Sequence, residues 1–353
     1  MEQDELLELP DDGGQKKKKK SGCLIALIVV LALLLAALIA VAVFMNYIFG
    51  RLGRFENPVP SGETMGVVPD ETETDPAENV EGLESMDATD VTFETVDVLE
   101  GDVINIMLIG QDRRPGEDRA RSDSMILVTL NKDKGTIQLT SFMRDLYVQI
   151  PGYVDTRLNA AYRYGGVELM NETFKVNFGL EIDGNVMVDF DEFTDIIEIL
   201  GGINISMTSD EAHYMNKWVD GEFQKGMNYL NADQALSFVR MRYLSGGDYG
   251  RTDRQRRVIM AIAESFRDAD LVTIFNVIDE ILPHIVTNLT DAQIIEYATA
   301  GLGILGGGGE MQTLRIPQDD AHKQANIRGM AVLVPNLEMC REDLKEFIYD
   351  NEG

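Results

Sequence analysis

The sequence predicts an α/β fold, an αβα sandwich with a central mixed β-sheet, preceded by one transmembrane helix. Short apolar runs typical of buried strands alternate along the chain with longer segments whose apolar residues recur at helical spacing. The 353 residues are 44% hydrophobic, which is enough to bury the core of one large domain beside attached segments. Before that domain, residues 24–44 form an uncharged apolar stretch of the length that spans a bilayer.

The start of the chain predicts a membrane anchor. We expect residues 1–21 to be a cytoplasmic tail, which ends in the lysine run 16–20, and residues 22–49 to hold the transmembrane helix. The apolar core is longer than the roughly 7–15 residues of a cleaved signal peptide. Lysines beside a membrane span stay in the cytoplasm, so we expect a single-pass cell-membrane protein whose remaining chain is extracellular.

The next segment, residues 50–100, is predicted to be an acidic extracellular linker. No Lys or Arg occurs between Arg54 and Arg113, while Glu and Asp recur. Low hydrophobicity and self-repulsion favour an extended spacer, with residues 91–98 as a candidate edge strand. The globular domain is therefore assigned to residues 101–353.

Composition excludes several classes of protein and site. The formal net charge of −29 argues against a nucleic-acid-binding protein, because no basic surplus exists to neutralise a phosphate backbone. Cys23 and Cys340 are the two cysteines, and membrane placement would separate them, so no disulfide is expected. The three histidines are scattered and no CxxC motif occurs, so neither a zinc site nor a His-based triad is predicted.

Within the domain, patterning predicts alternating strands and helices. The predicted strands are residues 104–110, 125–130, 136–142, 146–150, 185–190, 203–207 and 312–316. The predicted helices are residues 159–178 (interrupted at Gly165 and Gly166), 191–200, a helix opening at Ser209, 232–241 with Asn231 as N-cap, 253–267, 271–282, 291–300 and 336–349.

Acidic residues and arginines recur beside the ends of the first three predicted strands. Asp112 follows the first strand, Asp123 precedes the second, and Arg144 follows the third. Open α/β sheets build their sites at strand ends. Carboxylates without His or Cys nearby favour Mg²⁺ (or Mn²⁺) over zinc, so Asp112 and Asp123 are candidate metal ligands. Turn or capping roles are the alternative for two such acids.

Arginines that lie in or beside structured segments are candidate phosphate ligands: Arg121, Arg144, Arg240, Arg242, Arg251 and Arg254. Arg251 and Gln255 share a face at the start of the predicted helix 253–267, whose N-terminus would add an anion site. Arg240 and Arg242 can meet one ligand only if their helix has ended or the chain is extended there. The alternative is that these arginines pair with the many surface acids.

These residues occur in an ordered series of motifs that closely resembles the LytR-CpsA-Psr (LCP) domain, with a motif core at 103–266. The series reads Gly110-x-Asp112-x-Arg114, Arg121-Ser122-Asp123, Ser141-x-x-Arg144-Asp145, Arg157-Leu158-Asn159-Ala160-Ala161-Tyr162, Gly201-Gly202-Ile203, Ala235-Leu236-Ser237-Phe238-Val239-Arg240-Met241-Arg242 and Asp248-x-Gly250-Arg251-x-x-Arg254-Gln255. Two positions depart from the family pattern. Met143 stands where proline is usual, and Arg157 stands where lysine is usual.

The resemblance implies an LCP-type catalytic domain in a Gram-positive cell envelope. Such a phosphotransferase moves a glycopolymer, such as teichoic acid or capsular polysaccharide, from a polyprenyl-pyrophosphate carrier to peptidoglycan. By resemblance, Asp112 and Asp123 hold Mg²⁺, and the catalytic arginines are Arg121, Arg144, Arg240 and Arg242. The substrate-binding residues would be Arg157, Arg251, Arg254 and Gln255.

Several points stay open at the level of sequence. Asp112 is a candidate base for the acceptor hydroxyl, and the helices after Asp191 and Asp253 are candidate walls of an apolar tunnel for the lipid. The same site could hydrolyse the lipid pyrophosphate, or the protein could be a non-catalytic, lipid-binding envelope regulator. The motifs indicate neither the polymer, nor the accepting hydroxyl, nor a role for the residues after 271.

Overall fold

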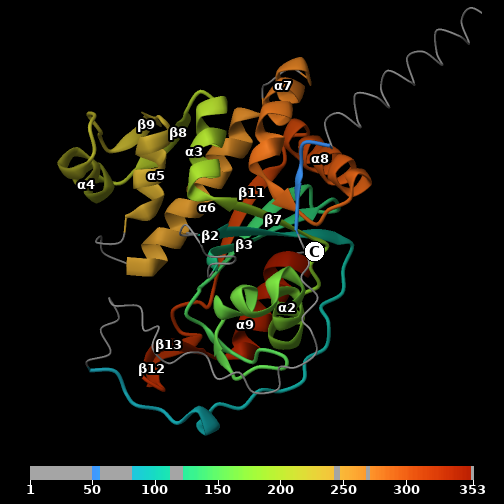
Figure 1. The fold of residues 1–353 in the computed structure, drawn as a ribbon, viewed down its shortest axis with the longest axis vertical. Helices are drawn as coiled ribbons and strands as arrows, with labels where there is room; N and C mark the ends of the chain where they lie inside the picture. The colour runs from blue at the N-terminus through green and yellow to red at the C-terminus, as the bar shows by residue number, and fades with distance from the viewer. Residues whose placement is uncertain (1–49, 56–81, 112–121, 242–246, 268–270, 351–353) are drawn as a thin grey trace, which may run out of the picture. The chain divides into compact units, whose positions relative to one another are not determined.

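A seven-stranded mixed sheet forms the centre of the domain (Figure 1). The computed structural model describes residues 50–55, 82–111, 122–241, 247–267 and 271–350. The sheet order is β1 (Gly53–Arg54), β10 (Val286–Thr287), β7 (Gly184–Asp189), β2 (Val103–Gln111), β3 (Ser122–Asn131), β4 (Thr136–Phe142) and β11 (Glu310–Ile316). The mixed α/β fold predicted from the sequence is therefore confirmed, and the strands expected at 104–110, 125–130 and 136–142 are β2, β3 and β4.

The pairing directions bring five strand ends to one edge of the sheet. β3 runs antiparallel to both β2 and β4, whereas β7 is parallel to β2 and β11 is parallel to β4. The carboxyl ends of β2, β4, β7 and β11 therefore meet the start of β3. We call this edge the site edge, and its terminal residues are Gln111, Ser122, Phe142, Asp189 and Ile316.

Side chains alternate between the two faces of the sheet, as the two-residue period of a strand requires. On β2, Met107 and Ile109 join the core formed with α2 (Ala160–Phe178) and α9 (Leu337–Leu344). Ile106 packs on the opposite face, against α8 (Asp291–Gly306). We call these the α2 face and the α8 face. Figure 1 shows α2 and α9 below the sheet and α8 above it.

Helix α2 has the interruption that its sequence predicts. Gly165 and Gly166 have non-helical backbone angles, and φ at Gly166 is +68°. The helix ends at Gly179 in the left-handed conformation, where a glycine has no Cβ penalty. Its last turns carry aromatic side chains that pack on Phe142 of β4, so this helix closes the α2 face of the sheet.

A second, smaller core lies beside the sheet and contains a hairpin of β8 (Ile203–Met207) and β9 (Gly226–Leu230). Helices α3 (Phe190–Ile199), α4 (Ser209–Trp218), α5 (Ala232–Arg240) and α6 (Gly247–Ser265) surround this hairpin. Asn231 caps α5, as predicted, and accepts a hydrogen bond from the backbone N–H of Gln234. β9 was not predicted. Between α6 and α8 lie α7 (Leu271–Ile281) and the 3₁₀ turn η2 (Leu282–His284).

The assignment of residues 50–100 to a linker is wrong for the parts that the structure describes. β1 pairs with β10 in the main sheet, and Ser85 forms a bridge with Asn326. The backbone N–H of Leu99 donates to the carbonyl of Gly179. Residues 91–98 form no strand; their apolar side chains, with those near η1 (Ala88–Asp90), instead pack around Tyr147. Spaced apolar residues among many acids are enough for this packing.

The C-terminal part adds an unpredicted hairpin of β12 (His322–Ile327) and β13 (Met330–Pro335), joined by the turn residues Arg328 and Gly329. Both have positive φ, as tight hairpin turns require. β13 also contacts a short hairpin of β5 (Tyr147–Val148) and β6 (Thr156–Arg157). The expected closing helix consists of α9 followed by a π-helical turn, η3 (Lys345–Tyr349).

The predicted membrane helix, within residues 22–49, lies outside the described residues. Among the helices that the structure does describe, none is both long enough and apolar enough to cross a bilayer.

The aromatic contact between β4 and α2 predicts a large effect on stability. Phe142 is 2% exposed, and its ring centroid lies 4.8 Å from that of Phe174 and 5.2 Å from that of Phe178. We expect Phe142→Ala to lower the free energy of unfolding by about 3–5 kcal/mol, measured by urea denaturation. Trp218→Ala, at a side chain that is 66% exposed, should change it by less than about 0.5 kcal/mol. Equal losses in both variants would contradict this view of the core.

Candidate functional site

A β-bulge at the site edge sets Asp123 apart from its neighbours on β3. Gly110 pairs with Ser124 and Gln111 pairs with Ser122, so Asp123 is the extra residue between the two pairs. A Cβ atom at Gly110 would lie 3.0 Å from the Cβ of Ser124, so glycine allows the close approach of the strands. Bulges redirect a side chain out of the regular alternation of a strand. The bulge therefore explains how Asp123 reaches the residues that follow β4.

Arg144, just beyond the end of β4, lies between three carboxylates. Its Nη1 donates to Asp123 Oδ1 at 2.5 Å, and its Nε lies 3.5 Å from Asp145 Oδ2 and 3.6 Å from Asp248 Oδ2. Burial opposes the charged form of Arg144, but the three carboxylates outweigh burial and raise its pKa above the ordinary value. Arg144 is therefore a permanent cation at the site edge.

Two more buried arginines extend this group. Arg157 Nε lies 3.8 Å from Asp145 Oδ1, and the same guanidinium donates to the carbonyl of Ala331 from Nε at 3.1 Å and from Nη2 at 2.7 Å. Arg251 Nη1 lies 3.3 Å from Asp248 Oδ1. We call this group the arginine–aspartate cluster; its members are Asp123, Arg144, Asp145, Arg157, Asp248 and Arg251.

Helix α6 begins at Gly247 and not at Asp253, so the predicted anion site at a helix start near Asp253 is wrong. The first turn contains two glycines, which weaken the helical signal in the sequence. Arg251 and Gln255 consequently lie inside the helix. Gln255 Oε1 accepts a hydrogen bond from the Ser124 hydroxyl at 3.1 Å, which ties α6 to the strand that carries the bulge.

Arg240 lies at the end of α5, and Arg254 lies inside α6. Helix α5 ends at Arg240, and Met241 has an extended ψ of 122°, so the condition that the helix must end before Arg242 is met. Arg240 is exposed. Arg254 is buried, donates to the carbonyl of Met241, and has its Nη1 3.7 Å from Glu211 Oε1. Arg254 thus holds the backbone between Arg240 and Arg242.

Three of the predicted site residues, Asp112, Arg121 and Arg242, lie outside the described residues. The cluster unites Asp123, Arg144, Arg157 and Arg251, while Gln255 contacts the neighbouring Ser124. Sequence reasoning gave no role to Asp145 or Asp248, although both stand in motifs beside a predicted arginine. The catalytic and binding roles of all these residues stay predictions.

The carboxylate oxygens of Asp123 are ligand atoms of the type that Mg²⁺ prefers. Mg²⁺ takes oxygen ligands, commonly one or two carboxylates, and completes its octahedral shell with water and phosphate oxygens. No group of three or more His, Cys, Asp or Glu side chains able to hold an ion occurs in the part of the chain that the structure describes. Magnesium (or manganese) at Asp123 and Asp112 stays a prediction, because Asp112 lies outside the described residues.

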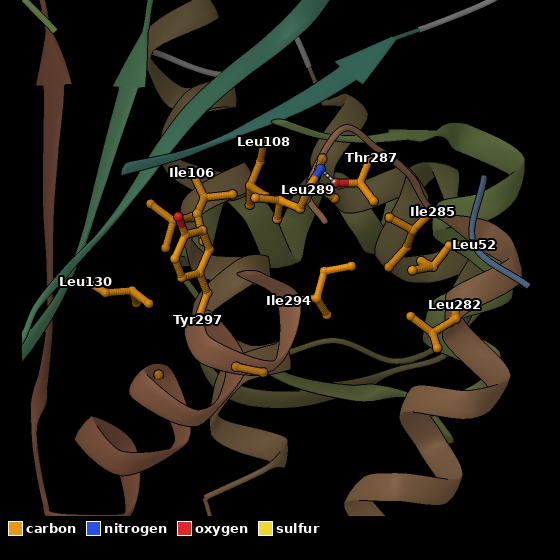
Figure 2. A pocket seen from close by; sticks show the side chains of 14 residues that line it. Leu52, Ile106, Leu108, Leu130, Leu282, Ile285, Thr287, Leu289, Ile294 and Tyr297 are labelled. Carbon is orange, nitrogen blue, oxygen red and sulfur yellow. Dashed lines mark hydrogen bonds between the residues drawn. The ribbon is translucent and has the colours of Figure 1, made fainter. Parts of the chain in front are cut away.

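An apolar cavity of about 290 Å³ lies on the α8 face of the sheet (Figure 2). Its walls come from strands β2, β3, β7 and β10, from η2, and from α8; Figure 2 shows Ile294 and Tyr297 of α8 facing the strand side chains. The Thr287 hydroxyl donates to the carbonyl of Asn185 at 2.7 Å and accepts from the N–H of Leu289 at 3.1 Å. Because the hydroxyl of Thr287, the threonine of the lining, is engaged in these bonds, the surface that the cavity presents is apolar.

The cavity and the arginine–aspartate cluster are connected through β3, which carries Asp123 and also lines the cavity with Val128 and Leu130. Ile106 and Leu108 of β2 line the cavity, and the next residue on that face, Gly110, pairs with Ser124 of the bulge. At about 3.3 Å per residue, Leu108 and Gln111 are roughly 10 Å apart. The helices after Asp191 and Asp253, which are the expected walls of an apolar tunnel, contribute no residue to the described lining of this cavity, whereas α8 and η2 do.

Glu211, the carboxylate that contacts Arg254, predicts that the free energy of unfolding depends on pH. Burial alone would raise the pKa of Glu211, but hydrogen bonds from Arg257 and from the backbone N–H of Thr208 hold its pKa below the ordinary value. A lowered pKa contributes stability above the unfolded-state pKa, and this contribution is lost as the pH falls through the folded-state pKa. Glu211→Gln should cost about 1–3 kcal/mol of unfolding free energy near pH 7.

Chemical denaturation near pH 7 and near about pH 3.5 measures this effect, because the difference between wild type and Glu211→Gln should shrink at the lower pH. Glu222→Gln, at an exposed glutamate of the same region, is the matched control and should show little change at either pH. A difference for Glu211→Gln that does not depend on pH would contradict the assignment.

Comparison with known proteins gives the family of this chain. Residues 71–346 match the profile of the LytR_cpsA_psr family. The polyisoprenyl-teichoic acid–peptidoglycan teichoic acid transferase TagU of Bacillus mycoides (strain KBAB4) is 32% identical over 240 residues, which are 66% of this chain and 74% of the relative.

Solved structures share the fold. Bacillus subtilis TagV has 29% sequence identity and a TM-score of 0.57, over 71% of this chain and 99% of TagV. The LytR-CPS2A-psr family protein YwtF (TagT) with bound octaprenyl pyrophosphate lipid has 23% identity and a TM-score of 0.54, over 73% of this chain and 97% of that chain. With the family match covering most of the domain, the chain belongs to the LytR-CpsA-Psr family.

Proposed function

We propose that this protein is a phosphotransferase that moves a glycopolymer from a polyprenyl-pyrophosphate carrier to peptidoglycan. The observation that carries the proposal is that β3 takes part in both features: it carries Asp123 of the arginine–aspartate cluster, and its residues Val128 and Leu130 line the apolar cavity. A ligand that is anionic at one end and apolar at the other fits this arrangement. The printed name of the TagU relative supports the same reaction.

The cluster would bind the pyrophosphate through positioned guanidinium groups. Arg144, Arg157 and Arg251 are held by carboxylates or by the Ala331 carbonyl, so little side-chain entropy is lost when a ligand binds. Guanidinium groups donate bidentately to phosphate oxygens and stabilise charge that develops during transfer. Arg121, Arg240 and Arg242 complete this set in the proposal, and Arg254 acts by holding the backbone beside Arg242.

Asp123 and Asp112 would hold Mg²⁺ (or Mn²⁺), which when bound supplies neutralisation of pyrophosphate charge and helps to orient the phosphates. Arg144, bonded to Asp123, keeps that carboxylate in a fixed orientation at the site edge. Asp112 is also the proposed base for the acceptor hydroxyl, and Gln255 steadies the bulge through Ser124. Phosphoryl transfer depends chiefly on such positioning and charge stabilisation.

The cavity under α8 would take part of the carrier's isoprenoid tail, because apolar chains gain about 0.8 kcal/mol per buried CH₂. YwtF (TagT), which shares the fold, was solved with an octaprenyl pyrophosphate lipid. A lipid substrate also agrees with the predicted anchor at residues 22–49, which would place this domain outside the cell at the membrane surface, with the tail 1–21 in the cytoplasm. Teichoic acid is the preferred polymer in the proposal, with capsular polysaccharide as the alternative.

Transfer by the full-length protein in detergent is the test of this proposal. We expect polyprenyl-pyrophosphate-linked oligosaccharide, Mg²⁺ and peptidoglycan fragments to yield a glycan–peptidoglycan phosphodiester, detected by mass, and we expect EDTA to abolish it. Arg144→Ala should reduce the rate at least about a hundredfold, because it removes a buried cation from a site that works by charge stabilisation. Its thermal unfolding should stay cooperative.

Each other outcome of the assay is informative. Release of phosphorylated glycan at a rate independent of peptidoglycan would establish a lipid-pyrophosphate hydrolase instead. Tight binding of the lipid pyrophosphate without turnover would establish a regulator. Full transfer activity in Arg144→Ala would remove the arginine–aspartate cluster from the mechanism.

The cavity itself can be tested by filling it from Gly301 of α8. A Cβ atom there would meet only the Cδ2 of Leu130, at 3.9 Å, so a side chain fits and projects among the lining residues. We expect Gly301→Leu to raise KM for the lipid substrate about tenfold, since displacing two buried CH₂ groups costs roughly 1.6 kcal/mol. Affinity for inorganic pyrophosphate should not change.

Gly303→Leu is the matched control, because Gly303 lies on the same helix, is exposed and has open space around its Cβ position. Its KM should equal that of the wild type. If Gly301→Leu binds the lipid as the wild type does, the isoprenoid tail lies elsewhere.

A further inference from the structure

The first turn of α6 carries Asp248, which contacts both Arg144 and Arg251. This turn is intrinsically weak as a helix, because it contains Gly247 and Gly250 and each glycine costs about 1 kcal/mol relative to alanine. The helix therefore cannot hold Asp248 in place by backbone propensity alone. A tertiary contact has to fix the turn.

Tyr249 supplies that contact. Its side chain is half-buried against the core of the α2 face, and its hydroxyl lies 2.6 Å from His322 Nε2. The Arg315 guanidinium covers the ring, with its Cζ 4.3 Å from the ring centroid. Tyr249 also accepts, through its carbonyl, a hydrogen bond from the Thr252 hydroxyl at 2.9 Å. One side chain thus anchors the turn to β11 and β12.

The second nitrogen of His322 determines the direction of this hydrogen bond. Nδ1 lies 2.9 Å from the carbonyl of Gln318, which can only accept, so Nδ1 carries the proton. In the neutral ring Nε2 is then an acceptor, and the Tyr249 hydroxyl donates to it. Both partners are therefore fixed in rotation, and the pair acts as a specific link and not merely as a packing contact.

The segment that carries His322 is itself attached to the cluster. The N–H of Met143 donates to the carbonyl of Ile316 at 2.9 Å, the N–H of Leu333 donates to the carbonyl of Asp145 at 2.9 Å, and Ala331 accepts from Arg157. Residues 316–333 therefore contact two segments at the cluster, the residues that follow β4 and Arg157 of β6, in addition to α6.

We propose that Tyr249 and His322 are positioning residues of the phosphate site. Their hydrogen bond fixes the first turn of α6 and, through Asp248, the orientations of Arg144 and Arg251. The inference deepens the proposed function, because it rests on that cluster as the pyrophosphate site. It also gives the C-terminal hairpin a role in the site, although the hairpin carries none of the predicted ligands.

The test uses the full-length protein in detergent and two measurements. Hydrogen exchange of the amides of residues 251–254, which donate to the carbonyls of the first turn of α6, reports the anchoring, and calorimetry with inorganic pyrophosphate and Mg²⁺ reports the site. Tyr249→Phe keeps the ring and removes the hydroxyl. We expect it to speed exchange at these amides and to weaken pyrophosphate binding, each roughly three- to tenfold, as the loss of one hydrogen bond implies.

Variants of His322 separate positioning from general structure. His322→Leu also removes the hydrogen bond to Gln318, so it should weaken pyrophosphate binding at least as much as Tyr249→Phe, and the double variant should lose no more than His322→Leu alone. His322→Gln retains an acceptor for Tyr249 and a donor for Gln318, so it should restore most of the affinity. Tyr349→Phe is the control, because its hydroxyl contacts Asn105 at 3.3 Å and lies away from the cluster.

Unchanged exchange or unchanged pyrophosphate affinity in Tyr249→Phe would overturn the inference, as would additive losses in the double variant. A wild-type protein that does not bind pyrophosphate would overturn it together with the proposed function. A wild-type protein that binds pyrophosphate but transfers no glycan would overturn the proposed function alone, and the effect of Tyr249→Phe on affinity would still decide the inference.

Discussion

Withdrawing a guanidinium group from water requires carboxylates or carbonyls beside it, and this requirement organises the site edge. Arg144 is surrounded by Asp123, Asp145 and Asp248, which come from β3, from the residues after β4, and from α6. These three segments can meet only because antiparallel pairing of β3 with β4 brings the start of one beside the end of the other. The sheet topology and the charge pairing therefore depend on each other.

The central strands could be predicted because their apolar runs are continuous and end in polar residues, as for β2 before Asp112. Elements whose stability comes from residues far away in the sequence could not be predicted in this way. β12 is mostly polar, and its pairing with the apolar β13 is supported by Tyr147 and by the segment around Met86. Residues 82–100 were judged by average composition, which does not register a few well-spaced apolar side chains.

For the site, sequence reasoning placed Asp123 and Arg144 together because strand ends meet at one edge, and the structure confirms their contact. It could not foresee that a bulge frees Asp123 from the ladder, since a bulge depends on the register of two strands. Arg254 illustrates the opposite limit. Its type and its neighbours in sequence predict a ligand, but they do not reveal that its side chain is buried beside Glu211 and donates to the carbonyl of Met241.

The charge balance of the cluster bears on how an anion could bind there. Arg144, Arg157 and Arg251 face Asp123, Asp145 and Asp248, so the cations and carboxylates of the cluster are equal in number. A pyrophosphate group brings several negative charges and would meet no net attraction from this group alone. Binding as proposed therefore requires further positive charge, which the predicted ligands Arg121, Arg240 and Arg242 and a divalent cation at Asp123 would supply. An arrangement of this kind keeps the arginines ordered through their aspartates, while the strength of anion binding is set by charges supplied from outside the cluster.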